Sequence, residues 1–175
     1  DLDDPDLSLH LHLGRGVAQL SLDGSGGSLH RRGYRTAMGA APLKENLAAG
    51  LIRLTGWDGS SPLVDPCCGS GVLLIEAALA ALQQAPGLER RFALEGWADF
   101  QPELWEKEVD RARQRRRRDL TVPLLLGIEA DPAIADQARA NVEAAGLSGI
   151  IRISTSPFED ETLPDGPGVL VCNPP

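Results

Sequence analysis

The sequence has little of what marks secreted, membrane-spanning or metal-binding proteins. Its three cysteines include the adjacent pair Cys67-Cys68, and there is no C-x-x-C spacing or Cys/His cluster, so neither a disulfide framework nor a zinc site is indicated. No apolar run approaches the roughly 20 residues that cross a bilayer. The start of the sequence, residues 1–6, is acidic and unlike a secretory signal. We expect a cytoplasmic protein with reduced thiols, no membrane contact and no bound metal.

Positive charge is also scarce. The 17 Lys and Arg residues are outnumbered by 25 Asp and Glu residues, for a net charge of −8, whereas attraction to phosphates needs a positive surface. The exception is the segment from Arg111 to Arg118, which has six arginines in eight positions. These arginines could contact RNA phosphates, or they could form a solvated helix face. Binding of a nucleic acid would therefore depend on this local patch or on segments outside the sequence.

The length and the hydrophobic pattern predict one main domain with a small β unit in front of it. The 175 residues suffice for one domain with its own core. Alternating apolar residues at 7–13 and 17–23 flank a glycine-rich turn and predict a β-hairpin. From Pro42 the period becomes helical, with one apolar face formed by Leu43, Leu47, Leu51 and Leu54. We assign residues 1–36 to the hairpin and a linker, and residues 37–175 to the main domain.

Strands and helices alternate along the rest of the chain. The predicted strands cover residues 63–65, 124–129, 150–154 and 169–172. The predicted helices cover residues 72–84 and 132–145, and an insertion at 86–122 contains a polar helix at 102–119. Strands separated by helices form parallel sheets with right-handed crossovers. The predicted fold class is therefore α/β, with a doubly wound, Rossmann-like sheet.

Ligands of such sheets bind beyond the carboxyl ends of the strands. The first strand of the main domain is followed by the glycine turn Asp65-Pro66-Cys67-Cys68-Gly69-Ser70-Gly71. A dinucleotide fingerprint would need a third glycine at Leu74, and the Gly-Lys-Ser/Thr of a P-loop occurs nowhere. Asp65 could instead hydrogen-bond a cationic amino-acid group, such as the methionine part of S-adenosylmethionine. Capping the helix or shaping the turn is the alternative role.

Two further strand ends carry polar residues. Glu129 ends the second strand, where a carboxylate can accept hydrogen bonds from both hydroxyls of a ribose. Asp131, which precedes a proline, is better placed to cap the following helix. Asn173 ends the last strand and is followed by two prolines. Its side-chain oxygen and a fixed proline carbonyl could accept the hydrogens of a planar amino group, or the segment could simply be a proline turn.

Several segments together resemble one enzyme family. They are Leu29 to Arg35, Ala41 to Ala48, Asp65 to Gly71, Leu73 to Ala78 and the terminal Asn173-Pro174-Pro175. In this combination they resemble the THUMP-associated 23S ribosomal RNA guanine-N2 methyltransferases, which are class I methyltransferases with an Asn-Pro-Pro-Tyr motif. The similarity extends from about Leu7 to Pro175.

The resemblance implies S-adenosylmethionine as the cofactor and a role for each strand end. The methionine and ribose parts would lie against Asp65, Pro66, Cys68, Gly69, Ser70 and Gly71. Glu129 would bind the ribose hydroxyls, and Ser156 would stand in for the Asp that contacts the adenine in the family. Asn173 and Pro174 would be the catalytic residues that bind the target amino group. No metal is implied.

The resemblance also implies a substrate and further segments. The activity would be methylation of the exocyclic amino group of guanine in ribosomal RNA. The RNA would be bound largely by a THUMP domain outside this sequence, and the sheet here would be truncated after its fourth strand. A DNA adenine or protein glutamine methyltransferase, which uses an Asn-Pro-Pro motif in the same way, is one alternative. A module that binds the cofactor without catalysing transfer is another.

Overall fold

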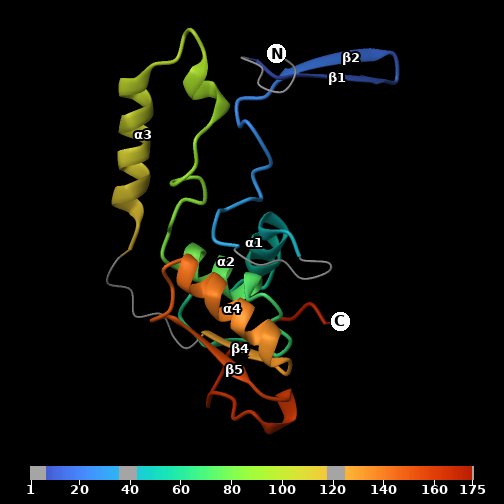
Figure 1. The fold of residues 1–175 in the computed structure, drawn as a ribbon, viewed down its shortest axis with the longest axis vertical. Helices are drawn as coiled ribbons and strands as arrows, with labels where there is room; N and C mark the ends of the chain where they lie inside the picture. Colours follow the sequence, from blue (N-terminus) through green and yellow to red (C-terminus); the bar gives the residue numbers. More distant parts are fainter. Residues whose placement is uncertain (1–6, 36–42, 118–124, 175) are drawn as a thin grey trace.

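A parallel sheet of four strands lies in the lower part of the molecule as drawn in Figure 1. The computed structural model describes residues 7–35, 43–117 and 125–174. The strand order is β5-β4-β3-β6, and every neighbouring pair is parallel. The strands are β3 (Leu63–Asp65), β4 (Leu125–Glu129), β5 (Ile151–Thr155) and β6 (Val169–Leu170). The predicted α/β class and Rossmann-like sheet are confirmed, although β6 is shorter than the predicted strand at 169–172.

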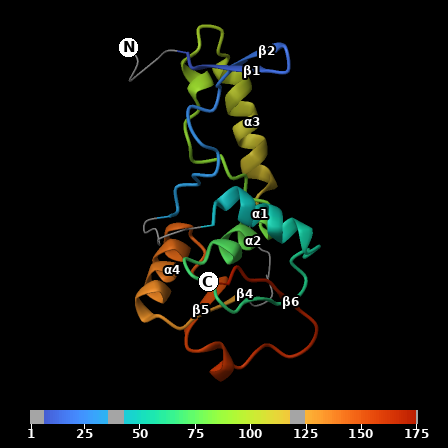
Figure 2. The same ribbon diagram turned by 90° about the vertical axis from the view of Figure 1, so that its right-hand side faces the viewer.

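Three helices lie on the side of the sheet that faces the upper part of the molecule in Figures 1 and 2. They are α1 (Glu45–Leu54), α2 (Val72–Ala81) and α4 (Pro132–Ala144). The helix α2 is apolar around most of its circumference and is buried from Val72 to Leu79, as expected for a helix at the centre of a core. Alternate residues of β3 and β4 point to the opposite face of the sheet, where Val64, Leu126 and Ile128 form a second buried cluster.

One glycine is required for α2 to approach the sheet. A Cβ atom added at Gly127 in β4 would lie 2.7 Å from Leu74 Cδ1, 2.8 Å from Ile153 Cδ1 and 2.9 Å from Cys68 Sγ. These separations are far below ordinary contact distances, so a side chain at this position would require Leu74, Ile153 or Cys68 to shift. The missing side chain lets α2, the glycine turn and β5 pack around the same point of β4.

The predicted apolar face around α1 is confirmed at Leu43 and Leu51, which pack against the core, and is wrong at Leu47 and Leu54. Leu47 and Leu54 are 53% and 84% exposed, whereas Ala48 and Ile52 are buried. The helix begins at Glu45, so Leu43 precedes it, and the small side chain of Ala48 sits in the interface instead of a leucine. The expected start at Pro42 lies outside the described residues.

The predicted hairpin is confirmed as β1 (Leu9–Gly14) and β2 (Val17–Leu22). The turn residues Arg15 and Gly16 have φ angles of 51° and 76°, the positive values that a tight two-residue hairpin turn needs. One face of the hairpin is entirely apolar, with the cross-strand pairs Leu9–Leu22, Leu11–Leu20 and Leu13–Ala18. The leucines of this face are 45% to 69% exposed.

The insertion after α2 folds back along the N-terminal segment. It contains the short helix η1 (Ala93–Gly96) and α3 (Pro102–Arg115). The amide of Leu94 donates to the carbonyl of Gly24 at 3.1 Å, and Arg90 donates to three carbonyls of residues 25–28. The hairpin and the insertion together form an arm that extends away from the sheet (Figures 1 and 2). The helix α3 ends at Arg115, earlier than predicted.

Candidate functional site

The three strand ends singled out in the sequence meet in one pocket of about 880 Å³. Nine of the ten predicted site residues line it: Asp65, Pro66, Cys68, Gly69, Ser70, Glu129, Ser156, Asn173 and Pro174. The tenth, Gly71, is the N-cap residue of α2 and is not part of the lining. Pro175 lies outside the described residues. The pocket's volume is within the range of sites for small molecules and cofactors.

The order of the strands explains why the pocket lies at this place. The chain passes from β3 to β4 and then to β5 on one side, and returns to place β6 on the other side of β3. Beyond β3 the two connections diverge, and this divergence opens a crevice at the carboxyl ends of the strands. Asp65 ends β3, and Asn173 follows β6 at the same edge of the sheet.

The backbone of the glycine turn is held by hydrogen bonds on both sides. Gly69 has a φ of 51° and Gly71 a φ of 80°, values that glycine adopts without strain. The amide of Cys68 donates to the carbonyl of Ile128 at 3.0 Å. The carbonyl of Ser70 accepts a hydrogen bond of 3.1 Å from the side chain of Asn141 in α4. The turn is therefore attached to both β4 and α4, which keeps its shape when no ligand is bound.

Asp65 is almost completely buried at the bottom of this turn, with 1% of its surface exposed. Its Oδ1 accepts a hydrogen bond of 3.2 Å from the amide of Cys67. Burial, with a smaller contribution from the charge of Glu129, raises the pKa of the Asp65 carboxyl to about 7. The predicted turn contact is thus present, but Asp65 does not cap the helix, because the N-cap residue of α2 is Gly71. A buried carboxyl of this kind is stabilised in its charged form by a bound cation.

Glu129 connects the end of β4 to the turn. Its Oε2 accepts a hydrogen bond of 3.1 Å from the amide of Gly69, and its Oε1 accepts one of 3.0 Å from the amide of Asp131. Each carboxylate oxygen has a second lone pair that a hydroxyl group could use. Asp131 caps α4, as predicted, by accepting from the amides of Ala133 and Ile134 at 2.8 and 3.4 Å.

The loop after β5 contributes residues that the sequence analysis missed. The hydroxyl of Ser156 donates to Oε2 of Glu161 at 3.0 Å, and Ser154 donates to the same oxygen. These hydrogen bonds hold the pKa of Glu161 below its usual value. Ser156 therefore already has a partner within the protein.

Phe158 and Glu159 also line the pocket, and their position directly after a strand end was the signal that could have identified them.

Leu43, Ile134 and Gln137 are the other lining residues without a predicted role, together with Cys67, Val72, Leu73, Ile128, Ala130 and Pro157. Ile134 and Gln137 lie on the first turns of α4. Leu43 comes from the segment that enters α1, whereas the leucine spacing predicts it on the face of a helix. No pattern in the sequence marks Leu43, Ile134 or Gln137 as a neighbour of the glycine turn.

Asn173 is exposed at the mouth of the pocket. The amide of Val171 donates to the carbonyl of Val64 at 2.9 Å, so the segment stays attached to β3 just before Asn173. Within the part of the chain that the structure describes, no protein group hydrogen-bonds to the side chain of Asn173. Its donor and acceptor groups are therefore both available to a ligand.

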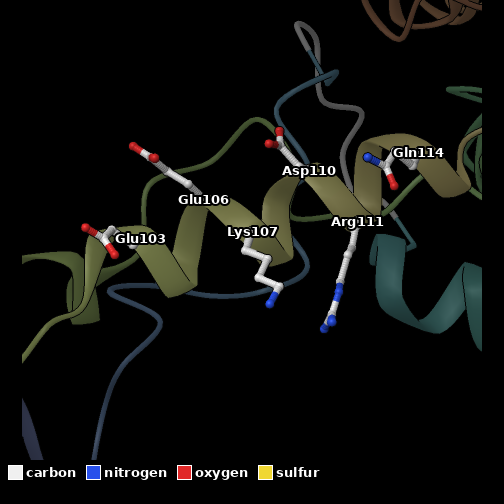
Figure 3. Close-up of a pocket in the computed structure, with 6 residues that line it drawn as sticks. All are labelled: Glu103, Glu106, Lys107, Asp110, Arg111 and Gln114. Atoms are coloured by element: carbon white, nitrogen blue, oxygen red, sulfur yellow. The ribbon is translucent and has the colours of Figure 1, made fainter.

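A second, shallower cavity of about 490 Å³ lies along α3 and involves the predicted arginine run (Figure 3). Lys107 and Arg111 extend to the same side of the helix. Arg111 is paired with Glu108, and Arg113 with Asp110 at 3.3 Å, and all four side chains are more than half exposed. The acids of the same helix thus balance these two arginines, which favours a solvated face for this part of the run. Arg118 lies outside the described residues.

Residues 7–35, 43–117 and 125–174 contain no group of three or more His, Cys, Asp or Glu side chains arranged to hold a metal ion. In the same ranges, no helix combines the length and apolar character needed to cross a membrane.

Comparison with known proteins identifies methyltransferases that are similar to this chain. A candidate RNA methyltransferase of Synechocystis sp. is 43% identical over 176 residues, which are 100% of this chain and 46% of that protein. The ribosomal RNA large subunit methyltransferase K/L of Desulfotalea psychrophila is 44% identical over 178 residues, 98% of this chain and 25% of that protein. SMU.472, a candidate methyltransferase solved in complex with SAH, superposes with a TM-score of 0.91 at 34% identity, covering 97% of this chain and 44% of that one.

The chain therefore spans less than half the length of these relatives. A family model described as the methyltransferase domain of RMKL-like proteins matches residues 32–175. The chain belongs to this family of RMKL-like methyltransferase domains.

Proposed function

We propose that this chain is the catalytic part of an S-adenosylmethionine-dependent RNA methyltransferase, and that it methylates the exocyclic amino group of a guanine in 23S ribosomal RNA. The observation that carries the proposal is the meeting of Asp65, Glu129 and Asn173 in one pocket. The ribosomal RNA methyltransferase among the relatives supports the substrate class. The choice of guanine N2 rests on the resemblance of the strand-end motifs.

The charge of the pocket supports this cofactor over a dinucleotide or ATP. Three carboxylates line the pocket, those of Asp65, Glu129 and Glu159, and none of the described lining residues is Lys, Arg or His. S-adenosylmethionine carries positive charge on its amino and sulfonium groups, whereas the phosphates of NAD and ATP are negative. A buried acid next to the ligand favours the cation and repels the phosphate.

Five residues of the pocket have a role in binding the cofactor. Asp65 accepts hydrogen bonds from the amino group of the methionine part, and the exposed backbone of Gly69 and Ser70 allows close approach. Glu129 accepts the ribose hydroxyls through its remaining lone pairs. Phe158 offers an apolar surface beside the pocket. When bound, S-adenosylmethionine supplies an electrophilic methyl group.

Asn173 and Pro174 orient the nucleophile. The side-chain oxygen of Asn173 and the carbonyl of Pro174 accept the two hydrogens of the amino group, so that its lone pair is directed at the methyl carbon. A bond forms from the nitrogen to that carbon while the carbon–sulfur bond breaks, and the nitrogen then releases a proton to solvent. Both acceptors also stabilise the positive charge that develops on the nitrogen.

Calorimetry tests the cofactor assignment. This chain should bind S-adenosylmethionine and its demethylated product SAH, and should bind NAD and ATP much more weakly. Tighter binding of NAD or ATP than of S-adenosylmethionine would overturn the proposal. The four titrations use the same folded protein sample, and failure of that sample to bind S-adenosylmethionine would also overturn the proposal.

A methyl-transfer assay on the full-length protein tests the substrate. Radiolabelled S-adenosylmethionine is incubated separately with protein-free ribosomal RNA, double-stranded DNA and a glutamine-containing protein fraction. N2-methylguanine in digested RNA is the expected product. N6-methyladenine in DNA or methylglutamine in protein would establish one of the alternative enzymes, and cofactor binding without transfer to any of them would establish a binding module.

A further inference from the structure

A buried ionic cluster attaches residues 31–35 to the main domain. The hydroxyl of Tyr34 donates to Oε1 of Glu76 in α2 at 2.9 Å, and Arg32 donates to both oxygens of Glu76 at 3.4 Å. Tyr34 and Glu76 are 6% and 4% exposed. This part of the cluster fixes the segment against α2 and does not reach the pocket.

Arg35 makes a different connection. Its Nη2 donates to the backbone carbonyl of Leu43 at 2.8 Å. Its Nε lies 3.6 Å from Oε1 of Glu45, the first residue of α1, and the two side chains are only 8% and 5% exposed. The guanidinium of Arg35 therefore contacts both the carbonyl of Leu43 and the carboxylate of Glu45, where the chain enters α1.

Leu43 forms part of the wall of the pocket that also contains Asp65 and Asn173. Its position is set by its backbone, and the carbonyl of that backbone is the group that Arg35 binds. Among the described residues, Oε2 of Glu45 and Nε of Arg35 are both buried without a hydrogen-bond partner, so these two side chains interact through their charges at 3.6 Å. Loss of the guanidinium would release both the carboxylate and the Leu43 carbonyl.

We infer that Arg35 is a positioning residue for the cofactor pocket, acting through Leu43. The inference rests on the proposed function, because it takes S-adenosylmethionine as the ligand. The planar guanidinium places Nη2 on the Leu43 carbonyl while Nε faces the Glu45 carboxylate at 3.6 Å, and the compact ammonium of a lysine does not reproduce this fixed fork. The Leu43 wall is thereby set before the ligand arrives, and pre-organisation of this kind lowers the cost of binding.

Arg32 provides a matched control. It is an arginine of the same segment, and its ion pair with Glu76 is as well buried, at 13% and 4% exposure. Its remaining hydrogen bond goes to the carbonyl of Leu29 and not to a residue of the pocket. Arg32→Gln and Arg35→Gln should therefore lower the melting temperature similarly, but only Arg35→Gln should change the pocket.

The test measures the affinity for S-adenosylmethionine and the melting temperature of both variants. We expect Arg35→Gln to raise the Kd about tenfold, as is typical of losing one pre-organising contact, and Arg32→Gln to leave it within about twofold. Equal Kd values for the two variants would overturn the inference. Failure of the unmodified protein to bind S-adenosylmethionine would instead overturn the proposed function.

A double-mutant cycle separates an effect through Leu43 from a general loss of structure. If Arg35 acts through Leu43, the Arg35→Gln substitution should change the Kd much less in a Leu43→Ala background, because the wall is already lost. Fully additive effects would contradict this route. Should Arg35→Gln fail to fold, Arg35→Lys keeps the charge beside Glu45 and is still expected to weaken binding; an unchanged Kd for Arg35→Lys would reject the inference.

Discussion

The backbone amide of Gly69 donates a 3.1 Å hydrogen bond to Oε2 of Glu129, which ties the glycine turn after β3 to the end of β4. The other oxygen of the same carboxylate accepts from the amide of Asp131. The residue that we propose to bind the ribose is therefore also the residue that holds the turn in shape. Substitutions at and near Glu129 test its proposed role in binding the ribose.

Glu129→Ala removes both acceptors and should raise the Kd for S-adenosylmethionine about 10- to 100-fold, since hydrogen bonds to a charged group contribute about 1.5 to 3 kcal/mol. Glu129→Gln keeps one acceptor oxygen, so its Kd should lie between the Kd of the unmodified protein and that of Glu129→Ala. Calorimetry measures both. Asp131→Ala is the control, because it removes the cap of α4 at a cost of about 1 kcal/mol and should leave the Kd nearly unchanged. An equal loss of affinity in the control would contradict a direct role for Glu129.

Asp65 makes stability depend on pH. Its pKa is about 7 in the folded protein and 3.8 as the ordinary value, so the folded state holds more protons than the unfolded state between these values. The contribution of Asp65 to the free energy of unfolding is therefore full below about pH 4 and is lost as the pH rises towards 7. Urea unfolding at several pH values should show this decline in the unmodified protein and a smaller one in Asp65→Asn. Parallel curves for the two proteins would show that Asp65 titrates normally.

Gly127→Ala should destabilise the fold by about 1 to 3 kcal/mol, the usual cost of overpacking a core. The new methyl group would lie within 3.0 Å of atoms of Leu74, Ile153 and Cys68. Gly149→Ala is the matched control, because a Cβ atom there meets nothing within 4 Å. Denaturant unfolding of the two variants measures the difference, and similar losses would mean that the close packing around β4 relaxes without cost.

Asn173→Ala in the full-length protein should lower the methylation rate by about two orders of magnitude, the scale of removing one polar contact to the transition state. The Kd for S-adenosylmethionine should barely change. Cys172→Ala, at the exposed neighbouring position, should leave both quantities near their normal values. An unchanged rate in Asn173→Ala would remove the catalytic role, and a matching loss of cofactor affinity would indicate a damaged pocket.

The parts of the fold that local patterns determine could be predicted from the sequence. The strand, glycine turn and helix around Asp65 have a short apolar strand, two glycines and a long apolar run in direct succession. The cap at Asp131 depends only on the next three residues, since Pro132 starts the helix and the amides of Ala133 and Ile134 donate to the cap. The residues at the strand ends could be grouped because the ends of parallel strands meet at one edge, whatever the connections between them.

Features that depend on distant contacts could not be predicted. Which face of α1 is buried depends on its packing against α2, and the leucine spacing alone pointed to Leu47 instead of Ala48. Glu161 reaches Ser156 because the loop after β5 turns back on itself, and no periodic pattern indicates that turn. The contact of Leu94 with Gly24 joins segments 70 residues apart in the chain, where the sequence had indicated only an insertion.

The leucine face of the hairpin has a practical consequence for work on this chain in isolation. A ribbon of two strands has two open edges, and its unpaired backbone groups can pair with another chain. Here those edges border an apolar surface of five leucines that are each at least 45% exposed, and exposed patches of this kind promote association. Light scattering from the purified fragment should therefore rise steeply with protein concentration, and replacing Leu11 and Leu20 by threonine should suppress the rise while preserving the strands.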